Sequence, residues 1–244
     1  MESSMPDHII ARSLSKSFSL LNGHSLSVLE NLSFTVGTGE IVGILGPSGC
    51  GKSTILNIVA GLSSFSGTLS ISKRLGLPKI GYVFQSPRLA PWLTVQQNVE
   101  LVMRPAGTLG SGPSLTYLEQ VGLGSAGALF PDELSEGMKA RVGIARALSI
   151  NPNILLCDEP FSSLDEITAM RLREEIQIIW SRRKLSILFV THNVDEAAFL
   201  CDRILLLKSR PAKVTREFCI DLPRPRVIRS KQLLAYVDRI YDSL

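Results

Sequence analysis

The 244-residue sequence lacks the features of a membrane-embedded or exported protein. Its longest apolar runs, at 186–190 and 204–207, have the length of a strand, whereas a membrane-spanning helix needs about 20 apolar residues. The first residues contain no basic region followed by an apolar core, so we expect no signal peptide. Neither a transmembrane protein nor a secreted precursor is therefore expected.

Cysteine is scarce and widely spaced. The four cysteines, Cys50, Cys157, Cys201 and Cys219, form no C-x-x-C pair, which argues against a disulfide framework and against a zinc site. Hydrophobic residues make up 45% of the chain and charged residues 20%, as in an ordinary globular protein. We expect a reduced, cytosolic chain long enough for one large domain or two small ones.

The net charge of +4 is only mildly basic, and much of the excess lies after residue 202. A solvated surface is the simplest interpretation. A nucleic-acid stripe and attraction to an anionic membrane face are the alternatives. The aromatic interleaving that single-strand binders need is missing from this region, so we expect no nucleic-acid partner.

One stretch organises the rest of the chain. It fits the pattern G-x-x-x-x-G-K-[ST], follows an apolar run at 41–45 and precedes a helical pattern at 54–60. Its residues are Gly46, Pro47, Ser48, Gly49, Cys50, Gly51, Lys52, Ser53 and Thr54. Strand, glycine-rich turn and helix is the context of a phosphate-binding loop, in which backbone N–H groups and the helix dipole face one anion. The alternative is a plain strand–turn–helix corner, which the flanking pattern disfavours.

The side chains of this loop have predictable tasks. Lys52 can reach the β- and γ-phosphates of a nucleotide, and the Ser53 hydroxyl can ligate Mg²⁺. The sequence therefore predicts a nucleotide site that uses a magnesium ion.

Two adjacent carboxylates follow a buried strand. Residues 153–157 are largely apolar, as in a parallel strand covered on both faces, and Asp158 and Glu159 come next. Such a pair is costly unless a cation or a proton uses it. Alternation along a strand places the two on opposite sides. We predict that Asp158 holds Mg²⁺ and that Glu159 polarises the attacking water.

Two more predicted strands, 80–84 and 186–190, end in polar residues. Gln85 follows the first, and Thr191 and His192 follow the second. Ligands of phosphate-binding sheets lie at the carboxyl ends of strands. We therefore expect Lys52, Gln85, Glu159 and His192 at one end of the sheet, with Gln85 near Mg²⁺ or the attacking water and His192 on the γ-phosphate. Taken singly, a solvated glutamine and a core histidine are the simpler interpretations.

The chain before the loop reads as an antiparallel hairpin, with strands at 8–11 and 31–36 and a turn at Asn22-Gly23. Phe18 in this hairpin could stack on a purine. Judged alone, its sequence context fits core or hairpin packing better.

Residues 86–150 change character. Prolines punctuate helical patterns near 94–103, 114–122 and 135–149, and strand patterns vanish. Ser135 is a good N-cap, so the last of these can be an ordinary helix start. The functional alternative is a second anion-binding helix terminus, with the Ser135 hydroxyl and the Gly137 N–H as donors.

Taken in chain order, these features resemble the nucleotide-binding subunits of ABC transporters over nearly the whole length. The matching residues are Phe18 (adenine-stacking aromatic), Gly46 to Thr54 (Walker A), Gln85 (Q-loop), Ser135 and Gly137 (signature motif, 134–138), Asp158 and Glu159 (end of Walker B), Asp165 (end of the D-loop) and His192 (switch histidine). The resemblance implies an ATPase that uses ATP and Mg²⁺. It also implies a head-to-tail dimer, in which the signature motif of one subunit closes over the ATP of the other.

The resemblance implies an α/β P-loop NTPase fold of the ABC type. We expect a single domain over 1–244, with a mixed-sheet core at about 8–85 and 151–220. An antiparallel β subdomain and an inserted helical subdomain at about 86–150 complete it, and a linker and helix occupy about 221–244.

A finer match lies in residues 89–99, 209–214 and 222–226, which are similar to the nitrate, sulfonate and taurine branch of bacterial importers. It implies an ATPase subunit at the cytoplasmic face of the membrane that powers uptake of a small solute. Its partners would be a transmembrane permease, indirectly a solute-binding protein, and a second copy of itself. The alternatives are a soluble, non-transport ABC ATPase acting on nucleic acid or ribosomes, and a soluble P-loop kinase.

Two residues depart from the family pattern. Glu136 replaces the first glycine of the usual pair in the signature motif, and a carboxylate facing a phosphate would be repelled. We predict that Glu136 points into solvent. Asn193 stands where an aspartate often follows the histidine.

Overall fold

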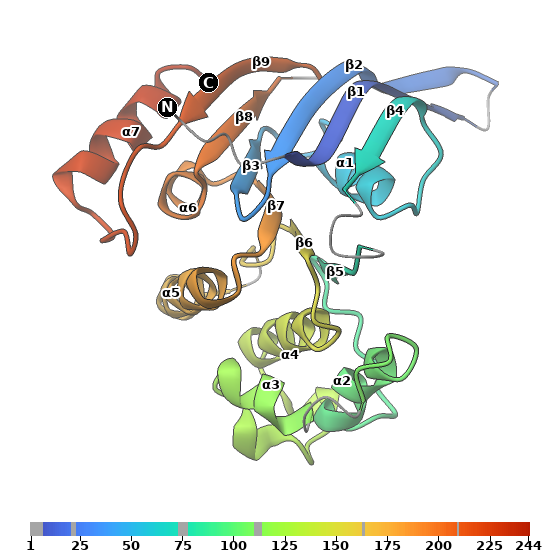
Figure 1. The fold of residues 1–244 in the computed structure, drawn as a ribbon, viewed down its shortest axis with the longest axis vertical. Coiled ribbons are helices and arrows are strands. Elements are labelled where there is room, and N and C mark those ends of the chain that lie inside the picture. The colour runs from blue at the N-terminus through green and yellow to red at the C-terminus, as the bar shows by residue number, and fades with distance from the viewer. Residues whose placement is uncertain (1–6, 21–22, 73–77, 110–113, 163, 209) are drawn as a thin grey trace. The chain divides into compact units, whose positions relative to one another are not determined.

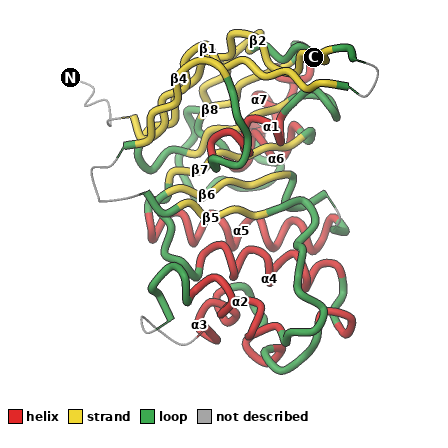
Figure 2. The backbone as a smooth tube through the Cα atoms, turned by 90° about the vertical axis from the view of Figure 1, so that its right-hand side faces the viewer, coloured by secondary structure: helices red, strands yellow, loops and turns green. Residues whose placement is uncertain are grey.

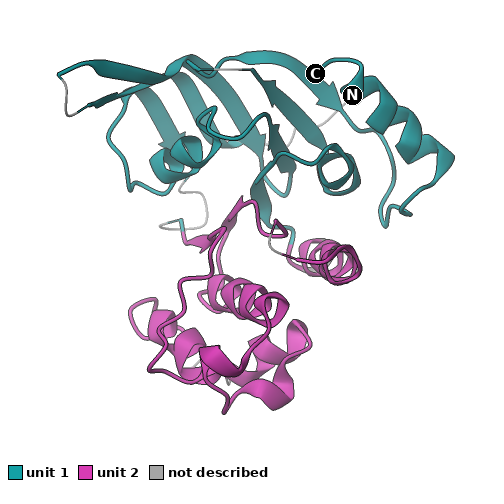
Figure 3. Ribbon diagram, turned by 180° about the vertical axis from the view of Figure 1, so that it is seen from behind, with its two compact units in different colours: residues 1–78, 184–244 teal, residues 79–183 magenta. Residues whose placement is uncertain are grey.

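The structure, a computed structural model, describes residues 7–20, 23–72, 78–109, 114–162, 164–208 and 210–244 (Figure 1). The chain forms two compact units (Figure 3). Unit 1 takes residues 1–78 and 184–244, and unit 2 takes residues 79–183.

Unit 1 contains the predicted antiparallel sheet, in the order β2-β1-β4. Its strands are β1 (Asp7–Ser19), β2 (Ser25–Gly37) and β4 (Ser66–Ile71). β1 and β2 are longer than predicted, because the serine-rich outer part of the hairpin continues the pairing as far as Ser19 and Ser25. Of the turn predicted at Asn22-Gly23, Asn22 lies outside the described residues.

The second sheet of unit 1 has the order β7-β3-β8-β9. Its strands are β7 (Ser186–Thr191), β3 (Ile41–Leu45), β8 (Arg203–Leu207) and β9 (Val214–Cys219). β3 pairs in parallel with both β7 and β8, and every residue of β3 and β7 is buried. Central parallel strands are covered on both faces, which explains their unbroken apolar runs. The last strand, β9, pairs antiparallel with β8.

Three helices of unit 1 are α1 (Lys52–Val59), α6 (Val194–Leu200) and α7 (Lys231–Tyr241). α7 is the helix expected near the end of the chain, and Leu233, Val237 and Ile240 form its buried face. It packs on α6.

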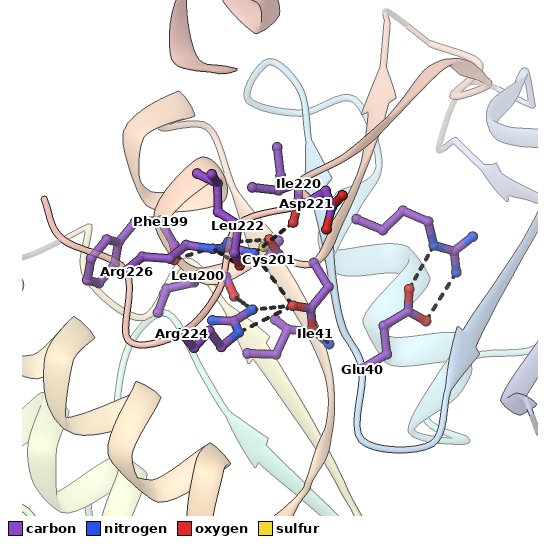
Figure 4. A network of polar contacts seen from close by, with 12 residues as sticks. Glu40, Ile41, Phe199, Leu200, Cys201, Ile220, Asp221, Leu222, Arg224 and Arg226 are labelled. Atoms are coloured by element: carbon purple, nitrogen blue, oxygen red, sulfur yellow. Dashed lines mark hydrogen bonds and ion pairs between the residues drawn. The ribbon is translucent and has the colours of Figure 1, made fainter. Parts of the chain in front are cut away.

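Two arginines, Arg224 and Arg226, fasten the linker before α7 to the core (Figure 4). The Arg226 guanidinium donates hydrogen bonds to the carbonyl oxygens of Ala198 (2.9 Å), Cys201 (2.6 Å) and Ile220 (3.0 Å). Arg224 pairs with Asp202 at 2.6 Å. Burial, and then the charge of Arg224, lower the pKa of Arg226 to about 10, so the group stays protonated at neutral pH. The end of α6 is therefore held by a cation from the linker.

Unit 2 consists of a short parallel strand pair and helices (Figure 2). Its elements are β5 (Ile80–Val83), β6 (Ile154–Asp158), α2 (Val95–Met103), α3 (Ser114–Gln120), α4 (Glu136–Leu148) and α5 (Glu166–Arg183), with 3₁₀ turns at Gly124–Ala126 and Pro131–Glu133. The predicted helices are present within two residues at each end. Unit 2 is larger than the predicted helical subdomain, because it also holds β5, β6 and α5. The division into subdomains stays a prediction.

Local sequence signals explain where two of these helices start. Thr94 caps α2 by accepting from the Gln97 N–H at 3.2 Å, while the Gln97 side chain accepts from the Thr94 N–H at 2.9 Å. Ser135 caps α4, as predicted. Within the described ranges, no helix has the length and apolar character needed to cross a membrane.

Candidate nucleotide site

The predicted site residues are divided between the two units. Phe18, Gly46 to Thr54 and His192 belong to unit 1, whereas Gln85, Ser135, Gly137, Asp158, Glu159 and Asp165 belong to unit 2. That all of them act on one nucleotide stays a prediction.

The phosphate loop joins β3 to α1 and requires glycine at specific positions. Gly49 and Gly51 have φ angles of 76° and 118°, in the left-handed region that side chains disfavour. At Gly46 a Cβ atom would lie 2.7 Å from the Leu207 carbonyl oxygen, and at Gly51 it would lie 2.9 Å from a methyl group of Val28. The loop therefore curls against β8 and β2 as a phosphate cradle needs.

Lys52 begins α1 and is 4% exposed. Its ammonium group donates to the carbonyl oxygens of Gly46 at 2.8 Å and Pro47 at 3.1 Å. These bonds orient the cation along its own loop. The next residue, Ser53, is exposed. Cys50 is buried, and burial raises the pKa of its thiol although the charge of Lys52 opposes the shift, so the thiol is uncharged at neutral pH.

A pocket of about 400 Å³ lies beside this loop. Its lining residues are Leu45, Gly46, Pro47, His192, Leu206, Leu207, Lys208 and Leu244. The structure thus places His192 in one pocket with the phosphate loop. Sequence reasoning missed Lys208, although it directly follows a strand parallel to β3 and the rule applied to strand ends could have found it. Leu244 carries no comparable signal, because its place depends on how α7 packs.

The segment around His192 is fixed by a capping arrangement. Asn193 caps α6 by accepting from the Glu196 N–H at 3.1 Å. The Thr191 hydroxyl donates to the Glu196 carboxylate at 2.7 Å and accepts from the Asn193 N–H at 3.0 Å. Asparagine and aspartate are equally good N-caps. The departure at Asn193 therefore keeps the start of this helix intact.

Phe18 lies near the end of β1 and is 43% exposed. Phe18 is therefore not a core residue, and packing within the hairpin stays the alternative to stacking on a purine. The ammonium group of Lys16 lies 4.9 Å from the centre of the Phe18 ring. An exposed aromatic ring is what stacking on a purine requires.

The carboxylates Asp158 and Glu159 have different environments. Asp158 is 7% exposed and accepts a hydrogen bond from the Tyr82 hydroxyl on the neighbouring strand β5. Burial, and then the charge of Asp158, raise the pKa of Tyr82 well above its ordinary value, so the hydroxyl remains a donor. Sequence reasoning did not single out Tyr82. Glu159 is half-buried with a φ of 44°, a strained backbone for a residue other than glycine, which is common at functional sites.

The donor chemistry fits a magnesium ion that arrives with a nucleotide. Magnesium is usually bound by one or two carboxylates together with substrate phosphates and water. Asp158 is a buried carboxylate, and the exposed Ser53 and Gln85 carry further oxygen donors. The part of the chain that the structure describes contains no cluster of three or more acidic, histidine or cysteine ligands.

A second pocket, of about 500 Å³, lies in unit 2 at the start of α4. It brings together Ser135, Glu136, Gly137, Met138, Leu164, Asp165 and Thr168, with Gly122, Leu123, Ser125, Ala126 and Arg141 completing its wall. The signature motif and the end of the D-loop are thus neighbours, which the sequence alone did not reveal. Ser163, within the D-loop, lies outside the described residues.

Polar contacts order this second pocket. The Ser135 hydroxyl accepts from the Met138 N–H at 3.2 Å. The Asp165 carboxylate accepts from the Thr168 N–H at 3.0 Å, and hydrogen bonds from Thr168 lower the pKa of Asp165. Glu136 has a 62% exposed side chain and pairs with Lys139 at 2.7 Å. Its carboxylate is exposed in the single chain, but Glu136 also lines this pocket, so its direction relative to a bound phosphate stays a prediction.

These features can be compared with known proteins. The family model described as ABC transporter matches residues 29–162. The chain belongs to the ABC transporter family. The match runs from β2 through the phosphate loop and the signature motif to Asp158 and Glu159.

Curated relatives of this ABC transporter ATPase are similar along most of their length. The aliphatic sulfonates import ATP-binding protein SsuB 1 of Pseudomonas aeruginosa is 45% identical over 217 residues, which cover 84% of this chain and 86% of the relative. The aliphatic sulfonates import ATP-binding protein SsuB of Bacillus cereus is 42% identical, covering 87% of this chain and 86% of the relative.

Solved structures agree with the family. The dimeric structure of a post-hydrolysis state of the ATP-binding cassette MJ0796, bound to ADP and Pi, matches with a TM-score of 0.76 and 29% identity. A dimeric structure of MJ0796 described as a bacterial ABC transporter cassette matches with the same TM-score and 31% identity. Each match covers 88% of this chain and all of the other. The predicted ABC-type α/β fold is confirmed, and the chain is an ATP-binding ATPase of this family.

Proposed function

We propose that this chain is the ATP-hydrolysing motor of an importer for aliphatic sulfonates or a related small organic anion. One observation carries the cargo class: relatives named for aliphatic sulfonate import match more than four-fifths of both chains at 45% and 42% identity. The cargo itself would be recognised by a permease and a solute-binding protein, because the pockets described above lie around nucleotide-binding motifs.

We propose that the phosphate loop and Lys52 bind the phosphates of ATP, and that the Phe18 ring stacks on the adenine. Asp158, with Ser53 and Gln85, holds Mg²⁺, which when bound offsets the negative charge of the phosphates. Glu159 accepts the proton of the attacking water.

His192 completes the assignment as a hydrogen-bond donor to the γ-phosphate. Its place in the pocket that holds Gly46 and Pro47 supports this role. The Thr191, Asn193 and Glu196 contacts fix the backbone on either side of it.

We propose that two copies act together head to tail. The pocket around Ser135 and Gly137 combines a helix N-terminus with the hydroxyl and N–H donors that suit phosphate. ATP held by a second copy would fill it. The dimers formed by the cassette MJ0796, one of them bound to ADP and Pi, support this arrangement.

We propose peripheral attachment to the cytoplasmic face of the membrane through a permease. Unit 2 exposes large apolar side chains, with Trp92 76%, Leu101 53% and Phe130 42% accessible. Aromatic side chains are enriched at protein interfaces, so these residues suit contact with a cytoplasmic segment of the permease.

Growth of a strain that lacks the gene tests the function. With an alkanesulfonate as the only sulfur source, we expect no growth, and sulfate should restore it. The wild-type gene should complement the defect, whereas the Glu159→Gln variant should not, because it cannot hydrolyse ATP. Normal growth of the deleted strain would refute the sulfonate cargo and leave the ATPase assignment intact.

A further inference from the structure

The geometry of β1 points to Lys16 as a positioning residue for Phe18. We propose that Lys16 covers one face of the Phe18 ring and links the ring to the segment that follows the phosphate-loop helix. The other face of the ring then stays accessible to the base. The inference rests on the proposed role of Phe18 as the surface on which the adenine stacks.

The strand pairing keeps Lys16 and Phe18 on one face. From Leu14 to Phe18 in β1, the partners in β2 are Leu32 for Leu14, Leu29 for Lys16 and Leu26 for Phe18. Each step of two residues in β1 therefore meets three residues in β2, so the extra residues bulge from β2 and β1 keeps its alternation.

Burial decreases steadily along this face of β1. Leu14 is fully buried, Lys16 is half-buried, and Phe18 is 43% exposed. The row of side chains thus leads from the core of unit 1 to its surface. Lys16 stands between the packed part of the row and the exposed ring.

The contacts of Lys16 link two parts of unit 1. Its ammonium group lies 4.9 Å from the centre of the Phe18 ring and donates to the Ser64 hydroxyl at 2.9 Å. Ser64 follows α1, the helix that starts with Lys52. Lys16 therefore connects the ring to the chain that leaves the phosphate loop.

This connection matters for ATP binding, because the base must contact the Phe18 ring while the phosphates contact the loop. A ring that is already oriented loses less rotational freedom when the base stacks on it. The attraction between an ammonium group and an aromatic face supplies that orientation.

Binding measurements with and without a base test the proposal. The dissociation constants of ATP and of inorganic tripolyphosphate, which lacks a base, would be measured for the wild type, Lys16→Met, Phe18→Ala and the double variant. We expect Lys16→Met to weaken ATP binding about two- to five-fold, the size of an exposed cation–π contact. Tripolyphosphate binding should not change, and Lys16→Met should have no further effect in the Phe18→Ala background.

Lys213→Met is the matched control, because Lys213 is an exposed lysine of unit 1 that pairs with Glu30 at 2.8 Å. It should leave both constants unchanged. Equal weakening of ATP and tripolyphosphate by Lys16→Met would show that the ammonium acts on the phosphates and would overturn the proposal. Unchanged or tighter ATP binding would overturn it too.

The same measurements distinguish a failure of the proposed role of Phe18 from a failure of the inference about Lys16. If Phe18→Ala leaves the ratio of the two dissociation constants unchanged, Phe18 does not stack on the base, and the inference falls with it. If Phe18→Ala changes that ratio and Lys16→Met does not, only the inference falls.

Discussion

Replacing Arg226 by methionine should destabilise the fold substantially. The side chain of Arg226 is 2% exposed, and its guanidinium donates to carbonyl oxygens at the end of α6 and after β9. Methionine fills part of the space but donates nothing. Each buried carbonyl left without a donor costs about 1 to 3 kcal/mol. The variant also avoids the cost of burying the cation, which offsets part of this loss by several kcal/mol.

We therefore expect Arg226→Met to lower the free energy of unfolding by about 3 kcal/mol, which moves a urea midpoint by about 1 M for a chain of this size. Arg226→Lys should recover only part of the loss, because an ammonium lacks the planar fork that serves several acceptors. Urea unfolding followed by circular dichroism measures both effects.

Arg229→Met is the matched control, since Arg229 is an exposed arginine of the same linker. Its effect should stay within about 0.5 kcal/mol. A loss below about 1 kcal/mol in Arg226→Met, or equal losses in both methionine variants, would refute the view that this cation fastens the linker to α6.

Two further predictions concern the site and the response to pH. On sizing chromatography, Glu159→Gln should form a dimer in ATP but not in ADP. The control Glu174→Gln, a change at an exposed residue of α5, should behave as the wild type. A Glu159→Gln variant that stays monomeric in ATP would contradict the dimer scheme. Burial lowers the pKa of His8 from 6.5, and its Nδ1 lies 2.8 Å from the Ser186 hydroxyl, so the unfolded chain takes up this proton first as the pH falls. The free energy of unfolding should therefore decrease below about pH 6.5. Urea unfolding at about pH 5 and about pH 7.5 measures this decrease, which should be smaller in His8→Asn than in the wild type. In the exposed-site control His24→Asn it should equal that of the wild type.

The features predicted well from the sequence are those with a local signal. The phosphate loop has glycines whose φ angles and close approaches only glycine tolerates. The N-cap at Ser135 and the apolar runs of β3 and β7 are likewise written into a few neighbouring residues. These elements depend on backbone sterics, hydrogen-bond capping and burial of a continuous run.

Other features had no local signal. The outer part of β1, residues 15–19, has one apolar residue, Phe18, among polar ones, and its extent is set by pairing with β2. The exposure of Phe18 could not be read from its neighbours, which fit a core residue as well. The hydrogen bond from Tyr82 to Asp158 joins residues far apart in the chain, so only the register of β5 on β6 reveals it.

The sequence by itself determined the family, the nucleotide chemistry and the position of nearly every element, because these follow from residue types at fixed spacings. The tertiary structure decided which side chains share a pocket. It placed Leu244 beside the phosphate loop, Asp165 beside Ser135, and the Arg226 guanidinium against the carbonyl groups at the end of α6. Such neighbours are set by the packing of segments distant in the chain, for which spacing along the sequence carries no information.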